Sequence, residues 1–147
     1  MSHPLPNFHF TVQIDDLEPK CVQVRNLAMH FENIETATSS NPTFADRKQP
    51  GRSVYENFFL ERAVFANQNE FFEWWRETQR AVVSGGDFRK NITISLLDNQ
   101  HSPIMQWRIG DAFPLRLSYS ELDAKGNRVL TEVLEIACES IDVRTDL

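Results

Sequence analysis

The sequence has few of the features that mark secreted or membrane proteins. Cysteine is scarce: Cys21 and Cys138 are the only two, which argues against a disulfide framework and predicts two buried thiols. No apolar run approaches the ~18 residues that a membrane span needs, and residues 1–6 lack the basic and apolar regions of a signal peptide. We therefore expect a soluble protein that is made in the cytoplasm and does not insert into membranes.

An excess of positive charge is also missing. The net charge is −6 and the pI is about 5.2, which argues against specific nucleic-acid binding. Arg47, Lys48 and Arg52 form the only dense basic cluster in the first half of the chain. Hydrophobic residues make up 41% and charged residues 24%, the balance of an ordered globular protein. The length of 147 residues fits a single domain, 1–147.

Recognisable catalytic and cofactor motifs are absent from the sequence. The four histidines lack metal-ligand spacing to Cys, Asp or Glu, and no G-x-S-x-G nucleophile turn occurs. Gly85-Gly86 follows the one expected helix, whereas a phosphate-binding glycine loop precedes its helix. We expect no catalytic residues, no cofactor and no metal. A small hydrolase whose carboxylates meet only in the fold stays open as an alternative.

Most of the chain alternates apolar and polar residues with a period of two, which predicts β-strands. In 8–14, Phe8, Phe10 and Val12 share one face. The simplest partner for this strand is the next one, 21–25, in a hairpin. Further strands are expected at 29–31, 54–63, 92–97, 104–109, 113–119 and 129–138. The expected core residues are Phe8, Phe10, Val12, Phe71, Trp74, Trp75, Ile94, Leu96, Trp107, Leu134 and Ile136.

Two segments interrupt this pattern. Residues 68–82 have helical spacing of their aromatic residues, an Asn67–Glu70 pair that resembles a capping box, and a glycine pair where the helix ends. Residues 36–52 are rich in turn-forming residues, which predicts a long irregular loop that binds something or moves. The predicted fold is mainly β: a small antiparallel barrel or sandwich with one α-helix, about 68–82, and a loop, about 36–52.

Four blocks resemble, in order and spacing, the tail-tube proteins of contractile phage tails and extracellular contractile injection systems. These blocks are Pro4–Phe10, Arg47–Gly51, Asn91–Asp98, and Phe113–Leu115 followed by Glu121–Asn127 and Val133–Ala137. Each block is weak by itself, but together they cover roughly 4–141. The type VI secretion tube protein is related to this family.

The resemblance implies a structural protein rather than an enzyme. Six copies would form a ring, joined strand to strand, and rings would stack into the tube inside a sheath. Each copy would be either a main-tube subunit or a subunit of the first ring on the baseplate hub. Its partners would be sheath, hub and spike proteins, and the lumen would hold cargo. The particle would assemble in the cytoplasm and then act as an extracellular or virion particle.

A contact to the neighbouring ring is expected from the basic loop. Its candidate residues are Phe44, Arg47, Lys48, Pro50, Gly51 and Arg52. The alternative is a monomeric β-sandwich that binds a ligand with the 36–52 loop.

Overall fold

The computed structural model describes residues 9–36 and 47–147. These residues form nine strands and one helix: β1 (Phe10–Ile14), β2 (Gln23–Arg25), β3 (Met29–Thr36), β4 (Arg47–Tyr55), β5 (Phe58–Ala63), α1 (Glu70–Ser84), β6 (Lys90–Leu97), β7 (Pro103–Tyr119), β8 (Thr131–Ala137) and β9 (Ser140–Arg144). All strand pairs are antiparallel. The prediction of a mainly β fold with one helix is confirmed.

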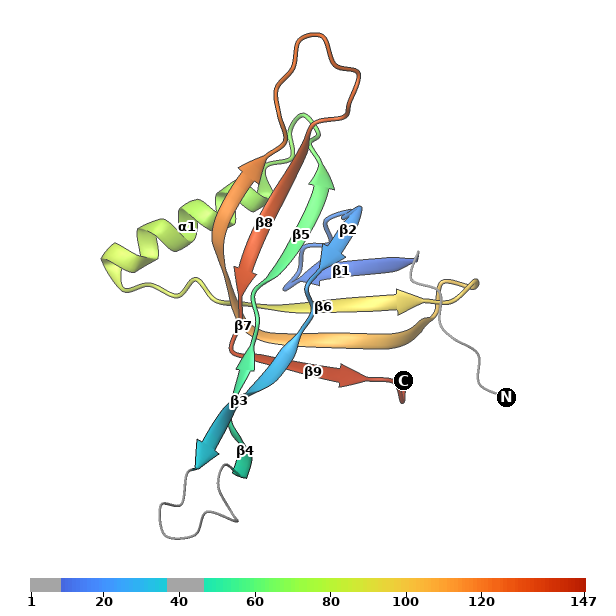
Figure 1. The fold of residues 1–147 in the computed structure, drawn as a ribbon. Helices are drawn as coiled ribbons and strands as arrows, with labels where there is room; N and C mark the ends of the chain where they lie inside the picture. The colour runs from blue at the N-terminus through green and yellow to red at the C-terminus, as the bar shows by residue number, and fades with distance from the viewer. Residues whose placement is uncertain (1–8, 37–46) are drawn as a thin grey trace.

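Strand β7 belongs to two sheets. Its first half pairs with β6 on one side and β9 on the other, whereas its second half, from Phe113, pairs with β8. The strand bends near Asp111, whose φ of 52° interrupts the extended backbone. The sequence predicted two strands here, 104–109 and 113–119, and it did not predict β9. Figure 1 shows the two sheets running in different directions from β7.

The sheets do not close into a barrel. The strand order is β1-β6-β7-β8-β5-β2, and β1 and β2 at its ends do not pair with each other. The expected hairpin between the first two strands is therefore wrong: β1 pairs with β6, and β2 pairs with β5. Alternation identifies a strand and its buried face, but it does not say which strand lies beside it.

The core lies where the two sheets and α1 meet. Its members include Val12, Phe58, Ile94 and Leu134, each at most 2% exposed. Four more expected core residues are buried: Phe71, Trp74, Leu96 and Ile136. Phe10 and Trp107 are partly buried and pack against the core, and Trp75 is half-buried. Phe8 lies outside the described residues.

Helix α1 begins at Glu70 and ends in a left-handed glycine. Its N-cap residue is Asn69, whose side chain makes no capping hydrogen bond, so the predicted Asn67–Glu70 capping box is wrong. Gly85 has φ of 80° and donates its N–H to the carbonyl of Ala81, as the glycine pair predicted.

No helix within residues 9–36 and 47–147 is long and apolar enough to cross a membrane.

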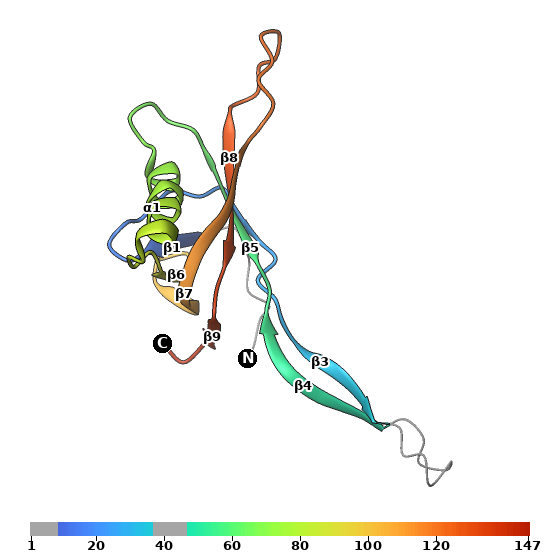
Figure 2. The same cartoon turned by 90° about the vertical axis from the view of Figure 1, so that its left-hand side faces the viewer.

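Residues 47–52 are not an irregular loop. They belong to β4, which pairs with β3 in a two-stranded ribbon. We call this β3–β4 ribbon the arm; Figure 2 shows it projecting away from the two sheets. Pro50 and Gly51 are turn-forming residues, but a two-stranded ribbon accepts a proline at its edge and a glycine at a bulge. Residues 37–46 of the predicted loop lie outside the described residues.

Replacing Trp74 tests the packing of the helix. The Trp74 side chain is 3% exposed, and its indole N–H donates to the carbonyl of Phe88 at 2.9 Å. We expect Trp74→Ala to lower the free energy of unfolding by about 3–5 kcal/mol, as for other buried aromatic residues. Urea denaturation provides the measurement, with Phe72→Ala on the exposed side of α1 as the control. Equal losses in the two variants would contradict this packing.

Candidate assembly interface

The arm continues two strands, β2 and β5, of the two sheets and helix that we call the body. We call the polar junction between arm and body, residues 26–28 and 56–57, the elbow. Asn26, with φ of 67°, separates β2 from β3, and Glu56 and Asn57 separate β4 from β5. The Asn26 amide donates to the Asn57 carbonyl at 2.7 Å, and the Glu56 N–H donates to the Ala28 carbonyl at 3.0 Å. These bonds join the two breaks, so that the ribbon leaves the sheet as one unit.

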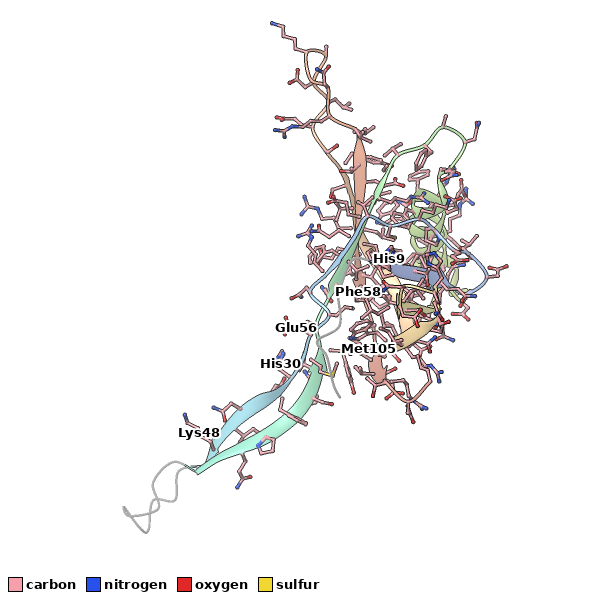
Figure 3. All side chains as sticks on the ribbon, turned by 90° about the vertical axis from the view of Figure 1, so that its right-hand side faces the viewer. His9, His30, Lys48, Glu56, Phe58 and Met105 are labelled. Atoms are coloured by element: carbon pink, nitrogen blue, oxygen red, sulfur yellow. The ribbon has the colours of Figure 1, made fainter. Side chains whose placement is uncertain are left out.

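Ionisable side chains surround this elbow. The His30 ring nitrogen Nδ1 lies 3.1 Å from a Glu56 carboxylate oxygen, and the Asn57 amide donates to Glu135 of β8 at 3.1 Å. Figure 3 shows His30 and Glu56 where the arm leaves the body, with Lys48 near its far end. These contacts join β3 and β8 to the two residues between β4 and β5, at the base of the arm.

One face of the arm is apolar and exposed. Met29 lies opposite Tyr55 and Phe31 opposite Ser53, and residues directly opposite each other in an antiparallel pair share a face. Tyr55 packs against the core, but Met29 is 45% and Phe31 is 64% exposed. A two-stranded hairpin is marginally stable by itself in water. The arm therefore presents an apolar surface that a partner would cover.

The predicted interface residues lie mostly on β4. Gly51 sits at a register shift, where a side-chain carbon would come within 2.7 Å of Ile34. Arg52 pairs with Glu32 at 3.0 Å in a largely exposed ion pair, and Lys48 is exposed. Pro50 lies opposite Asn33, and Arg47 is the first residue of β4. Phe44 lies outside the described residues. The other five predicted residues all lie on β4.

The sheets end in open edges. Strands β1, β2 and β9 each pair with a single neighbouring strand within the described part of the chain. Such an edge presents unpaired N–H and C=O groups to which another chain can add a strand. Together with the arm, the edges give the body several surfaces suited to contacts between copies.

A buried ion-pair network joins α1 to the sheet. Arg62 is 2% exposed and lies opposite Glu132 of β8, which accepts from its Nε at 2.6 Å. A second nitrogen of Arg62 donates to Glu70, in the first turn of α1, at 2.8 Å. The guanidinium also stacks on the Phe71 ring at 4.2 Å. Sequence reasoning missed this network; the signal was a charged pair, Glu61-Arg62, inside an otherwise apolar strand.

Other ionisable groups offer little chemistry. Burial raises the pKa of the Cys21 thiol to about 12, and it also raises the pKa of Cys138. Both thiols are free and poorly ionised, and therefore weak nucleophiles. The described residues contain no group of three or more His, Cys, Asp or Glu side chains that could hold a metal ion.

The described residues thus form a β-rich module with open sheet edges and a projecting ribbon. The model of the family "T4-like virus tail tube protein gp19" matches residues 6–142. The chain therefore belongs to this tail tube family, whose members are structural proteins and not enzymes. A comparison with curated proteins found no match.

Solved structures share the fold. A chain in the sheath–tube complex of the extracellular contractile injection system PVC has 24% identity and a TM-score of 0.81, over 97% of this chain and 93% of that chain. A chain in the 6-fold symmetrised baseplate of the anti-feeding prophage AFP has 19% identity and a TM-score of 0.81, over 100% of both chains. Hcp1 from Flavobacterium johnsoniae has 13% identity and a TM-score of 0.58, over 92% of this chain and 94% of that chain.

Removing the buried arginine tests the ion-pair network. Arg62→Ala leaves Glu132 buried without its cation, so we expect a loss of about 3–5 kcal/mol in the free energy of unfolding. Arg52→Ala, which breaks an exposed pair, is the control and should cost about 0–1 kcal/mol. Urea denaturation measures the two losses. A small effect at Arg62 would show that the pair contributes little to stability.

Acid pH should weaken the contact between α1 and the sheet. Burial disfavours the charged form of Glu70, but the hydrogen bond and charge of Arg62 outweigh it and hold the pKa of Glu70 below its ordinary value of 4.5. The stability that ionised Glu70 contributes is therefore present above pH 4.5 and is lost as the pH falls through the lower folded pKa. Urea denaturation of wild type and Glu70→Gln should differ at pH 7 and converge in acid. A difference that does not change with pH would contradict this assignment.

Proposed function

We propose that this chain assembles into rings of six copies, which stack into the inner tube of a phage-like contractile injection particle. The observation that carries the proposal is the combination of open sheet edges with an apolar arm in a tail tube family member. The 6-fold symmetry of the AFP baseplate, which contains a chain of the same fold, supports the ring of six.

Strand pairing between copies explains how a ring closes. An open edge is a liability in a monomer, because it can pair with any other exposed strand. A closed ring removes this liability, since each copy joins one neighbour on each side and no edge stays free. The free edges of β1 and β9 bound one sheet and β2 bounds the other, so each copy offers strands to more than one neighbour.

Contacts between rings would come from the arm. Its predicted interface residues, Arg47, Lys48, Pro50, Gly51 and Arg52, lie on a ribbon that extends beyond the body. Strand β4 has nine residues and spans about 30 Å, compared with a radius of gyration of about 15 Å for a compact domain of this length. The arm is therefore long enough to reach another copy.

The chain would be either a main-tube subunit or the tube-initiating ring on the baseplate hub. Chains of this fold occur in a PVC sheath–tube complex and in the AFP baseplate, which supports both positions. A sheath protein outside, hub and spike proteins at one end, and cargo in the lumen would be its partners. The chain would be made in the cytoplasm and end in an extracellular or virion particle.

Sizing and electron microscopy of the purified protein test assembly. We expect rings or short tubes, alone or with baseplate proteins; a protein that stays monomeric in both conditions would overturn the proposal. Lys48→Glu with Arg52→Glu should shorten the tubes by weakening ring stacking. Stability should hardly change, because exposed charges contribute about 0–1 kcal/mol.

A matched variant separates a local effect from a general effect of charge. Arg76→Glu with Arg80→Glu reverses the same number of charges on exposed positions of α1. This variant should form tubes of wild-type length. Equal shortening in the two variants would show that net charge, and not the arm, controls stacking.

A further inference from the structure

The second sheet of the body is open at both of its edges. It consists of the second half of β7 (Phe113–Tyr119), β8, β5 and β2, in that order. Within the described residues, β2 pairs only with β5, and this half of β7 pairs only with β8. The Trp75 indole donates to the Leu115 carbonyl at 3.3 Å, and β7 continues beyond this contact to Tyr119. A neighbouring copy can therefore add a strand at either edge.

The first sheet, β1–β6–β7–β9, is less open. Ile14 and Leu17 exchange two backbone hydrogen bonds, at 2.7 and 2.8 Å, in an antiparallel bridge. The chain itself thus occupies one end of the β1 edge. The second sheet is therefore the one that can continue without obstruction from copy to copy.

Strand directions also favour closure of the second sheet. Its strands are antiparallel to their neighbours and even in number, so β2 runs opposite to β7. Rotation about the axis of a ring leaves the direction of each strand along that axis unchanged. When β2 of one copy lies beside β7 of the next, the new pair is again antiparallel, and six copies can close one continuous sheet.

Only one face of this closed sheet can point inward. Four strands from each of six copies, about 4.8 Å apart, give a circumference of roughly 115 Å and a radius of about 18 Å. Figure 2 shows α1, β1 and β6 on one side of β5 and β8. A helix layer and a sheet layer, each about 10 Å thick, would fill that radius. The rest of the body must therefore lie outside, and the opposite face must surround the channel.

The register of the four strands gives the residues of this opposite face, because residues directly opposite each other share a face. They form two rows: Gln23, Glu61, Val133 and Ser118, and then Arg25, Phe59, Glu135 and Arg116. None of these eight residues is buried. The other charged residues of these strands, Arg62 and Glu132, are buried and pair with each other on the core face.

The charges of the opposite face cancel. Glu61 is the only charged residue of the first row, whereas Arg25 and Arg116 outnumber Glu135 in the second. Within the described residues, none of these four forms an ion pair. The face thus has no net charge, although the chain as a whole carries −6. In a ring, a negative row would lie next to a positive row around the channel.

We propose that this face is the wall of the channel and that the cargo it meets is a polypeptide. A nucleic acid carries a single sign of charge, so the arginine row would hold its phosphates and the glutamate row would repel them. A polypeptide carries both signs, and a wall without net charge neither holds nor excludes it as a whole. This inference rests on the proposed function and names the residues that face the cargo.

Accessibility in assembled tubes tests the position of this face. In tubes, Gln23→Cys should react with a small maleimide dye but not with maleimide coupled to a bead, because a bead cannot enter the channel. Unassembled protein should react with both reagents. Arg80→Cys, at an exposed position of α1, is the control and should react with both reagents in both states. The wild type measures the background from Cys21 and Cys138.

The outcomes separate this inference from the proposed function. If the bead labels Gln23→Cys as fast in tubes as in unassembled protein, the face lies outside; the inference then fails while the tube stands. Absence of any assembly by the wild type would instead overturn the proposed function. Ser118→Cys, in the same row, provides the same measurement if Gln23→Cys does not assemble.

Small thiol reagents of either charge test the kind of cargo. At low salt, a cationic and an anionic methanethiosulfonate should label Ser118→Cys in tubes at rates within about threefold of each other, since the wall has no net charge. A preference of about tenfold or more for one sign would show a charged channel and overturn the assignment of a polypeptide cargo. Adding Arg116→Glu should create a preference for the cationic reagent. Unchanged rates in that variant would show that Arg116 does not face the channel, and would also count against the inference.

Discussion

Strand β7 is the constraint on which the architecture depends, because both sheets hydrogen-bond to it. Its first half holds β6 and β9, and its second half holds β8. The bend near Asp111 turns the second sheet against the first, so that the apolar faces of both sheets enclose one core. A straight strand in this position would leave the sheets side by side, with each apolar face open to water.

The Arg62 network is a second link between the sheet and the helix. It links β5, β8 and the first turn of α1 through two carboxylates. Burying such a group carries a large desolvation penalty, which its hydrogen bonds and the Phe71 ring only offset. The network ties the first turn of the helix to β5, the strand that follows the arm.

The core of the two sheets and α1 is buried, whereas several edges and the arm are exposed. Open edges at β1, β2 and β9, together with the apolar face of the arm, are surfaces that a solitary protein would ordinarily protect. In the proposed ring assembly, neighbouring copies would cover these surfaces. The polar elbow at Asn26 and Glu56 supports this view, because it holds the arm away from its own body and available to another copy.

Local patterns in the sequence were enough for the β-rich class, the helix with its glycine end, and the lack of recognisable catalytic motifs. Alternation and helical spacing are properties of neighbouring residues, so Val12, Trp74 and Ile94 could be assigned to buried faces without a structure. Strand partners, the bend of β7 and the pairing of Arg62 with Glu132 depend on residues far apart in the chain. Turn-forming residues misled the prediction at Pro50 and Gly51, because an edge strand accepts them. Tertiary structure alone decided that this segment is part of an arm, since the arm is formed by the pairing of β3 with β4.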